Sequence, residues 1–363
     1  MQLLLWFFVF AGIANFSGGL VSVISWFFVR KKYGKARQEK NKKASIIIPF
    51  KGKNVDNIEY FLKQDYNDYE VIVVVDSMEE ANEIKSKFGV KVEITEKLPK
   101  CSGKISAMLT GIKKSNGNIY IFADADIKPH EKWLSYLVGG IEKNSIATSY
   151  RWYFENKLLS VWNASVASIL FYNAFNFAWG GSMAIAKKDF ENLGIAKIWR
   201  ESLVDDLTLT MKAKKSGYKI NFVPQAISEA EEEENMIKWM NKEMAWIRYY
   251  FPSLWGLALF ITLAMRAGVV AGFVIFFFHP VIGFMLFSPI IFDIFRGWQE
   301  YATFTQLMEY DRHRFFPWYV HAFLRPLIPF ILAYNLISSA FIREIEWGGK
   351  KYKIARNKID GSA

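Results

Sequence analysis

The uneven distribution of charge is the feature that most constrains how this chain folds. Charged residues are dense between positions 30 and 250 and sparse before and after that stretch. Residues 3–29 contain no charged side chain, and about 20 apolar residues suffice for a helix that crosses a bilayer. Apolar runs return at residue 251 and continue, with interruptions, to residue 342. The pattern predicts a polar domain held between membrane segments.

Basic residues cluster after the first apolar run and again after the last one. Basic residues next to a membrane segment mark its cytoplasmic side and favour anionic lipids. The net charge of +11 therefore indicates a lipid bilayer, and no nucleic acid, as the partner. The single cysteine, Cys101, fits a cytoplasmic domain without disulfides. The clustered basic residues are Arg30, Lys31, Lys32, Lys35, Arg37, Lys40, Lys42 and Lys43, then Lys350, Lys351, Lys353, Arg356 and Lys358.

The membrane topology follows in part from these clusters. The first apolar segment has basic residues after it and none before it, so we interpret it as a retained anchor with its N-terminus outside. Two spans, at 267–292 and 319–342, would return the tail to the cytoplasm. A hairpin within 253–296 would give three spans and an external tail, unless one segment is re-entrant or interfacial. We favour a cytoplasmic tail. The expected parts are an anchor at 1–29, a basic linker at 30–43, a domain at 44–250, a membrane region of two or three segments at 251–342 and a basic cytoplasmic tail at 343–363.

The middle of the chain alternates between strand and helix patterns. The run at 70–76 is continuous and rich in valine, which is typical of a strand buried on both faces of a parallel sheet. Strands that alternate with helices of 10–15 residues indicate an α/β fold with a mostly parallel sheet. A helix at 158–177, buried or facing the membrane, and a solvated acidic loop at Glu229 and 231–234 interrupt the later part. We expect strands at 45–49, 70–76, 90–95, 119–124, 148–153 and 183–186, and helices at 54–64, 78–88, 104–114, 133–141, 207–216 and 236–250.

Carboxylates stand at three places in this domain. Asp76 follows one strand, and Asp124 and Asp126 follow another. Ligands of open α/β sheets bind at the carboxyl ends of the strands, so these side chains are expected to share a crevice. Asp205 and Asp206 begin a helix. Such a set suits transfer of a group from a nucleotide diphosphate, with carboxylates that bind the nucleoside, hold a metal and accept a proton from a hydroxyl group.

Several short motifs resemble one known family. Pro49-Phe50-Lys51-Gly52 is similar to a Pro-x-Lys-Gly motif, and Ser102-Gly103-Lys104 is similar to a donor-side Gly-Lys helix. Asp65-Tyr66 with Tyr69-Glu70-Val71, and the tail Trp347-Gly348-Gly349-Lys350-Lys351-Tyr352, match two further segments. Over residues 44–250, with weaker echoes to the tail, the chain resembles the inverting glycosyltransferases of family two, closest to the ceramide glucosyltransferase branch. The resemblance implies a GT-A fold, with a mostly parallel sheet flanked here by transmembrane helices.

The resemblance also implies roles for individual residues. Asp206 matches the catalytic base, and Asp205 precedes it. Asp124 and Asp126 would hold Mg²⁺ or Mn²⁺ with the nucleotide, and the donor would be a UDP-sugar. The residues implied in donor binding are Pro49, Lys51, Asp76, Lys104 and Asp124.

One motif departs from the family. The family has Gln/Arg-x-x-Arg-Trp after the base, whereas here Trp246 is kept and Ala245 replaces the arginine. Arg248 is a candidate substitute, although it lies on another face of the helix. The pair Gly181-Ser182 allows a close approach of the backbone. We assign Gly181, Ser182, Trp246 and Arg248 to the clamp on the acceptor or the diphosphate.

These features predict a membrane-bound enzyme with a cytoplasmic catalytic domain, in the cell membrane if the source is prokaryotic. It would move a sugar, glucose or a similar hexose, from a UDP-sugar to a lipid hydroxyl. Two other enzymes of the same family, a polyprenyl-phosphate sugar transferase and a polysaccharide synthase, stay open. A third alternative is a non-catalytic transporter or lipid-binding scaffold, in which Arg266 and Arg325 would line a path through the membrane.

Overall fold

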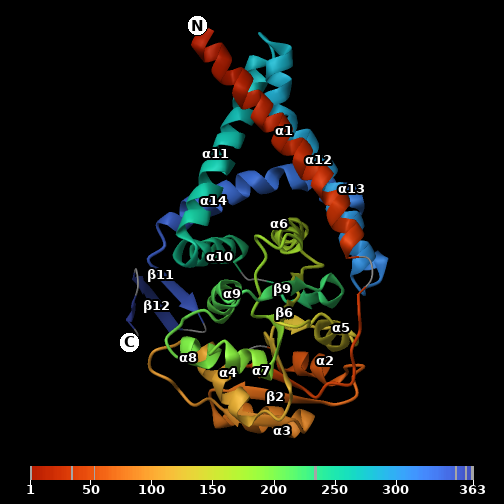
Figure 1. Cartoon of the computed structure of the whole chain (residues 1–363), viewed down its shortest axis with the longest axis vertical. Helices are drawn as coiled ribbons and strands as arrows, with labels where there is room; N and C mark the ends of the chain where they lie inside the picture. Colours follow the sequence, from red (N-terminus) through yellow and green to blue (C-terminus); the bar gives the residue numbers. More distant parts are fainter. Residues whose placement is uncertain are drawn as a thin grey trace.

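A computed structural model describes residues 2–33, 36–52, 54–232, 235–347, 350–355 and 358–360. It has an α/β domain at one end, and long apolar helices project from that domain in one direction (Figure 1). The mixed α/β class, with a mostly parallel sheet and long flanking helices, is confirmed. Lys35, Arg356, Gly348 and Gly349 lie outside the described residues, as do Glu233 and Glu234 of the acidic run.

The main sheet has seven strands in the order β3-β2-β1-β4-β8-β6-β9. All neighbouring strands are parallel except β8, which runs antiparallel to both β4 and β6. A smaller sheet has the order β5-β10-β7. The strands are β1 (Ala44–Pro49), β2 (Tyr69–Val75), β3 (Lys91–Ile94), β4 (Ile119–Ala123), β5 (Ile127–Lys128), β6 (Ser145–Thr148), β7 (Arg151–Trp152), β8 (Ser182–Ala186), β9 (Lys219–Phe222) and β10 (Ser228–Ala230).

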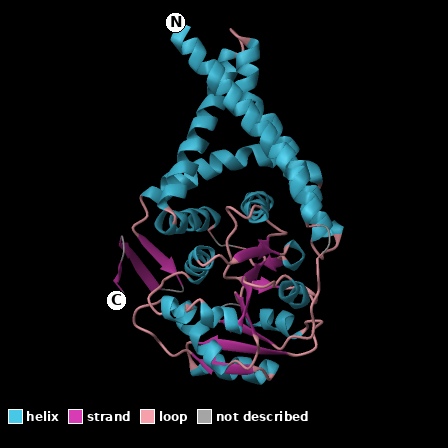
Figure 2. Ribbon diagram, viewed as in Figure 1, coloured by secondary structure: helices cyan, strands magenta, loops and turns pink. Residues whose placement is uncertain are grey.

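Helices cover both faces of this sheet (Figure 2). Their bounds are η1 (Val55–Asn57), α2 (Ile58–Leu62), α3 (Met78–Phe88), α4 (Gly103–Lys114), α5 (Trp133–Gly139), α6 (Lys157–Ala167), η2 (Ser168–Phe171), α7 (Lys187–Asn192), α8 (Ile195–Trp199), α9 (Asp205–Lys215), η3 (Pro224–Ala226) and α10 (Met236–Tyr250).

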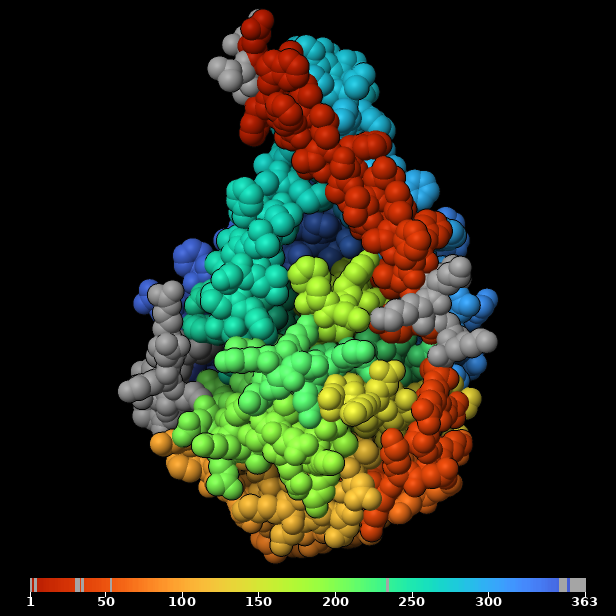
Figure 3. Space-filling view, viewed as in Figure 1, coloured from red at the N-terminus to blue at the C-terminus, as the bar shows by residue number. Residues whose placement is uncertain are grey.

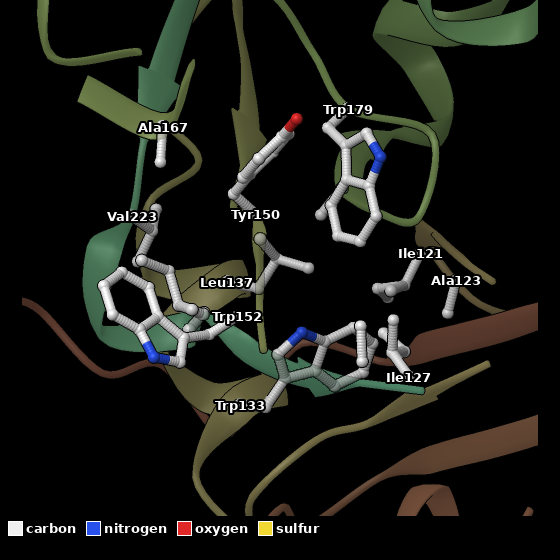
Figure 4. Close-up of a cluster of buried hydrophobic side chains, with 14 of the residues drawn as sticks. Ile121, Ala123, Ile127, Trp133, Leu137, Tyr150, Trp152, Ala167, Trp179 and Val223 are labelled. Carbon is white, nitrogen blue, oxygen red and sulfur yellow. The ribbon is translucent and has the colours of Figure 1, made fainter. Parts of the chain in front are cut away.

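Strand β1 shows why the sheet is buried on both sides. Alternate side chains of a strand point to opposite faces, and Ile47 packs into one apolar cluster while Ile46 and Ile48 pack into the other. Helix α4 lies close against the first of these faces. A Cβ atom on Gly111 would lie only 2.5 Å from the Ile47 side chain, so glycine lets α4 approach the sheet. Figure 4 shows the opposite cluster, where Trp133 lies near Ile127.

Three expected elements differ in the structure. The strand predicted at 148–153 is two strands, β6 and β7, because the chain leaves the main sheet at Ser149 and Tyr150 and joins the smaller sheet. The helix predicted at 158–177 continues only to residue 171, as α6 and η2. The prediction of a solvated acidic loop is wrong for Glu229, which lies in β10 and forms an ion pair with Arg314.

The C-terminal apolar region folds as a helical hairpin followed by a bent pair of helices. The chain turns at residues 276–279, so the interpretation of 267–292 as one span is wrong. Arg266 lies within the first helix of the hairpin and pairs with Asp293 of the second, at 3.3 Å. The elements are α1 (Gln2–Lys32), α11 (Pro252–Ile275), α12 (Pro280–Leu307), η4 (Arg312–Arg314), α13 (Trp318–Leu324), η5 (Arg325–Leu327) and α14 (Ile328–Ala340), then β11 (Glu344–Trp347), β12 (Lys350–Ala355) and β13 (Lys358–Asp360).

Within the described residues, four helical segments are long and apolar enough to cross a membrane by length and composition, namely Leu5–Val29, Pro252–Ile275, Pro280–Leu307 and Trp318–Ala340. They differ in direction. Helices α1, α11 and α12 rise away from the domain, whereas α14 runs across their base, between α11 and α12 (Figure 1).

A buried charged cluster joins these helices to the domain. Glu300 of α12 is fully buried and pairs with Arg296 at 3.0 Å and with Arg325 at 3.1 Å. Ser168 of the domain donates a hydrogen bond of 3.0 Å to the same carboxylate. The chain therefore satisfies this buried charge from three separate elements.

Candidate active site

A large cavity lies at the carboxyl ends of β1, β2 and β4 and extends toward the membrane helices. Its volume is about 1120 Å³. Among the predicted site residues, the carboxylates of the α/β domain line it together. The predicted residues at its wall are Pro49, Lys51, Asp76, Lys104, Asp124, Asp126, Asp205, Asp206 and Trp246. The expectation that Asp76 shares a crevice with Asp124 and Asp126 is thus met, and Asp205 and Asp206 line the same cavity.

Lys104 joins two of these segments. Ser102 caps α4 by accepting from the backbone N–H of Ile105, and this start places Lys104 in the first turn of the helix. Its ammonium group lies 2.6 Å from an Asp124 oxygen and 3.4 Å from an Asp205 oxygen. Burial opposes the charge on Lys104, but the two neighbouring carboxylates outweigh that effect and raise its pKa. Lys104 is therefore a permanent cation within a group of carboxylates.

Asp206 is held at the N-terminus of α9 and faces the cavity. One carboxylate oxygen accepts from the backbone N–H of Gly180 at 3.1 Å, and the other accepts from that of Leu207 at 2.6 Å. Burial, and then the neighbouring Asp205, raise the pKa of Asp206 to about 7. A carboxylate with a pKa near neutral is suited to accept a proton at physiological pH.

Asp205 lines the same cavity but is less exposed than Asp206. It is almost fully buried, and burial raises its pKa as well. Its carboxylate lies against Lys104 and against Gly180, where a Cβ atom would be only 2.3 Å from an Asp205 oxygen. Asp205 therefore positions Lys104 and the backbone beside it, while Asp206 remains the more accessible of the pair.

Gly181 and Ser182 support the site from behind. The Gly181 carbonyl accepts from the backbone N–H of Asp124 at 3.2 Å, and a Cβ atom on Gly181 would lie 2.7 Å from the Asp124 carboxylate. The Ser182 side chain is fully buried in β8 and accepts from the Trp133 indole at 2.8 Å. Neither residue lines the cavity.

Lys51 and Asp76 form the outer edge of the site. Pro49 ends β1 and the chain turns there, so Lys51 reaches Asp76 at the end of β2, with 3.3 Å between the ammonium and carboxylate groups. Both side chains are partly exposed. Both residues are among those that the sequence resemblance assigns to donor binding, and both line the cavity.

The two predicted clamp residues of α10 separate. Trp246 lines the cavity and packs with Leu203 and Val204. Arg248 turns away and binds the carbonyl oxygens of Ser339 and Ile342 at the end of α14. Arg248 therefore fastens α10 to α14 and does not reach the cavity.

Other cavity residues carried no recognisable sequence signal. Arg151 is a buried cation whose guanidinium lies 4.5 Å from the ring centre of Trp239 and 5.0 Å from that of Trp179, and it pairs with Glu243 at 3.8 Å. Trp179 lies beside Tyr150 (Figure 4). These side chains meet only because β7, α10 and the segment before β8 converge in the fold.

Tyr352 lies at the end of a tail motif that resembles the family but was not assigned to the site by sequence. It belongs to the tail motif that resembles the family, and the tail hairpin folds back onto the domain. Its hydroxyl accepts from the backbone N–H of Gly103, at 3.4 Å, beside Lys104. The motif could have been assigned to the site, but only the fold shows that the end of the chain returns there.

The site offers two carboxylates to a divalent cation, and such a cation would need further ligands from the substrate. In the described part of the chain, no group of three or more His, Cys, Asp or Glu side chains is arranged to hold a metal. Asp124 and Asp126 both face the cavity at the end of β4. Mg²⁺ is commonly bound by one or two carboxylates together with substrate phosphates and water, so this donor set suits a metal that arrives with a nucleotide.

Comparison with known proteins identifies the family of this site. Glycosyl transferase family 21 matches residues 8–360, which is nearly the whole chain. The chain belongs to glycosyl transferase family 21. It is a glycosyltransferase, as expected, and the non-catalytic alternative is not supported. The resemblance noted in the sequence named family two and its ceramide glucosyltransferase branch; the match itself is to family 21.

Two relatives of this chain are named as glycosyltransferases. The chain is 28% identical over 299 residues to the Probable glycosyltransferase YdaM of Bacillus subtilis (strain 168), covering 75% of this chain and 68% of that protein. It is 30% identical over 137 residues to the Dolichol-phosphate mannosyltransferase of Pyrococcus furiosus, covering 32% of this chain and 38% of that protein.

Two solved structures are distantly similar. GalNAc-T7 with UDP, GalNAc and Mn²⁺ has a TM-score of 0.42 and 16% identity, and covers 58% of this chain and 49% of its own. Staphylococcus aureus TarS 1–349 has a TM-score of 0.36 and 16% identity, and covers 86% of this chain and 96% of its own.

Proposed function

We propose that this chain transfers a hexose from a UDP-sugar to the hydroxyl group of a membrane lipid, in the manner of a ceramide glucosyltransferase. One observation carries the proposal. The cavity that holds Lys104 and Asp206 is continuous with a space lined by Leu254 of α11 and by Leu332 and Leu336 of α14. A polar donor and an apolar acceptor can therefore reach one site from different sides.

The reaction is a single displacement with inversion at the sugar. Asp206 accepts the proton of the acceptor hydroxyl as that oxygen forms a bond to the anomeric carbon. The bond from this carbon to the diphosphate breaks, and the diphosphate leaves with the electron pair. Lys104 balances negative charge on the departing group, since it is a fixed cation at the helix terminus where phosphates bind.

The remaining residues bind and orient the donor. Asp76 and Lys51 lie where the nucleoside would be held, at the end of β2. Asp124 and Asp126 would hold Mg²⁺ or Mn²⁺, which supplies positive charge near the diphosphate when it is bound. Trp246 and Tyr352 close the cavity on the side of the tail hairpin.

The direction of the helices supports a topology with three crossings. Helices α1, α11 and α12 would span the bilayer, and α13 with α14 would lie along its cytoplasmic face (Figure 1). The domain and the tail then share one side, and both basic clusters of the sequence lie on that side, as the positive-inside rule requires. The far turn at 276–279 contains no lysine or arginine.

The test is an assay of the full chain in lipid nanodiscs with radiolabelled UDP-hexoses and defined lipids, followed by mass analysis of the product. A hexose on a lipid hydroxyl supports the proposal. Absence of transfer from every UDP-hexose, with UDP binding retained, would overturn it.

A second candidate acceptor is a polyprenyl phosphate. It is favoured by the similarity to a dolichol-phosphate mannosyltransferase and by Arg296 and Arg325, which line the same cavity and could meet a lipid phosphate. The same product analysis separates the two, because a phosphate-linked sugar is released by mild acid and a sugar on an alcohol is not.

A further inference from the structure

The cavity opens sideways at the foot of the membrane helices. Figure 3 shows a hollow between α1 and α11, with residues of the yellow-green segment at 160–180 below it and α14 behind it. The residues at this opening come from separate elements. Those that line the cavity here are Ser22 of α1, Ile169 of η2, Tyr172, Phe175, and Leu254 and Ala258 of α11.

The lower edge of the opening is apolar and uncovered. Ile169 is 43% exposed and Phe175 is 58% exposed, although both line the cavity whose wall also includes residues of α11 and α14. Large apolar side chains that line a ligand groove and remain exposed mark a surface that something else covers. Leu254, on the opposite side of the opening, is also 40% exposed.

This edge is firmly built. The side chain of Asn176 donates a hydrogen bond of 2.7 Å to the carbonyl of Ile220 in β9. Lys214 of α9 binds the carbonyl oxygens of Asn173 and Ala174, each at 3.3 Å. These bonds anchor the loop that carries Phe175. The exposure of its apolar side chain is therefore a property of an ordered loop.

The edge is also tied to the membrane helices on both sides. The hydroxyl of Tyr172 lies 3.0 Å from that of Ser25 in α1. Ser168, directly before Ile169, donates to Glu300 of α12. The height of this edge relative to the bilayer is thus fixed by α1 and α12, at the end of each helix that meets the domain.

The cavity changes in character from this opening to its interior. Its mouth is lined by Ile169, Phe175 and Leu254, whereas its inner end holds Lys104, Asp206 and the other carboxylates. An amphipathic molecule that enters here would leave its chains among apolar side chains and bring its head group to the polar end. A water-soluble acceptor would gain nothing from this arrangement.

We propose that a bilayer lipid enters the site sideways through this opening, between α1 and α11, with its chains over Ile169 and Phe175 and its head directed toward Asp206. The inference rests on the proposed function, in which that lipid is the acceptor. It adds the route and the residues that contact the lipid chains.

The first test compares two acceptors in Phe175→Asp and Ile169→Asp. A carboxylate at the edge opposes an apolar chain, so we expect transfer to a long-chain lipid to fall about tenfold or more, through KM for the lipid. Transfer to a short-chain, water-soluble analogue should change less than about twofold. Tyr60→Asp is the control, since Tyr60 is 43% exposed on α2 and does not line the cavity. Equal loss with both acceptors would overturn the proposal.

The second test does not depend on activity. In a Cys101→Ser background, a fluorophore on Phe175→Cys or on Tyr60→Cys is measured in nanodiscs that contain lipids with brominated chains. We expect quenching at position 175 and none at position 60. An unquenched label at position 175 would overturn the route. A quenched label in a chain that glycosylates no lipid would overturn the proposed function and leave the route in place.

Discussion

Two charged clusters line the same cavity and are built in opposite ways. In the domain, the carboxylates of Asp124, Asp126, Asp205 and Asp206 outnumber the one lysine among them. At the membrane end, the carboxylate of Glu300 is fully buried between Arg296 and Arg325, and Arg325 also pairs with Asp293 at 3.6 Å. The first cluster places four carboxylates around the cation of Lys104 on a wall open to ligands. The second neutralises its carboxylate and joins α12, η5 and η2. We therefore expect the first cluster to act in the reaction and the second to hold the fold.

The largest expected effect is at the domain cluster. Asp206→Asn removes the proton acceptor but keeps the shape and the bond from Gly180. We expect the transfer rate to fall by about 10²–10⁴-fold, the range that general base catalysis contributes. UDP-sugar binding, measured by calorimetry, should stay within about twofold. Asp205→Asn serves as the comparison, and a larger rate loss there than in Asp206→Asn would reverse the two assignments.

The matching change at the membrane cluster should act on stability instead. Glu300→Gln leaves two arginines without their shared carboxylate, and removal of one partner from a buried ion pair costs about 3–5 kcal/mol. We expect a lower midpoint of thermal unfolding in detergent and a reduced yield. The kcat of the protein that remains folded should be close to that of the parent. A loss of kcat at unchanged stability would show that this cluster also takes part in the reaction.

Lys104 is buried, as Glu300 is, but it belongs to the cluster that we propose to act in the reaction. Lys104→Met removes the cation beside Asp124 and Asp205. Removal of one electrostatic stabiliser of a transition state typically costs about 10²–10³-fold in kcat, and we expect a loss in that range. Lys51→Met is the control at the exposed edge, where the ion pair with Asp76 is solvated and a smaller loss is expected. Similar losses in both variants would argue against a special role for Lys104.

The same contrast explains how much of the molecule could be predicted from the sequence. The buried strands β1, β2 and β4 read as apolar runs, and the carboxylates at their ends follow from parallel-sheet geometry. In the membrane region, the same apolar composition is compatible with different numbers of helices. The turn at 276–279 lies within an apolar run, so nothing in that run distinguished the hairpin from a single span.

Side-chain direction was the second limit. Arg248 and Ser182 fit a clamp by sequence, but tertiary contacts with Ser339 and Trp133 take them out of the cavity. Tertiary contacts also place Arg151 at the cavity wall, where the rings of Trp179 and Trp239 from two distant segments hold it. Contacts between segments far apart in the chain decide these positions, and the local pattern does not contain them.

The smallest expected effect is on the pH dependence of the transfer rate. It should distinguish the cluster of Asp206 from that of Glu300. Asp206 has a pKa of about 7 in the folded chain and an ordinary value of 3.8. As a base it must be ionised, so we expect transfer to fall about tenfold per pH unit below 7 and to level off above it.

The folded state binds this proton more tightly than the unfolded state does, so the contribution of Asp206 to stability is greatest below pH 4 and declines as pH rises toward 7. Asp206→Asn should therefore flatten the pH profile of residual transfer and, relative to the parent, gain stability above pH 7. Glu300→Gln should keep the parent's pH–rate profile, and a displaced profile in that variant would mean that the two clusters are electrostatically coupled through the cavity.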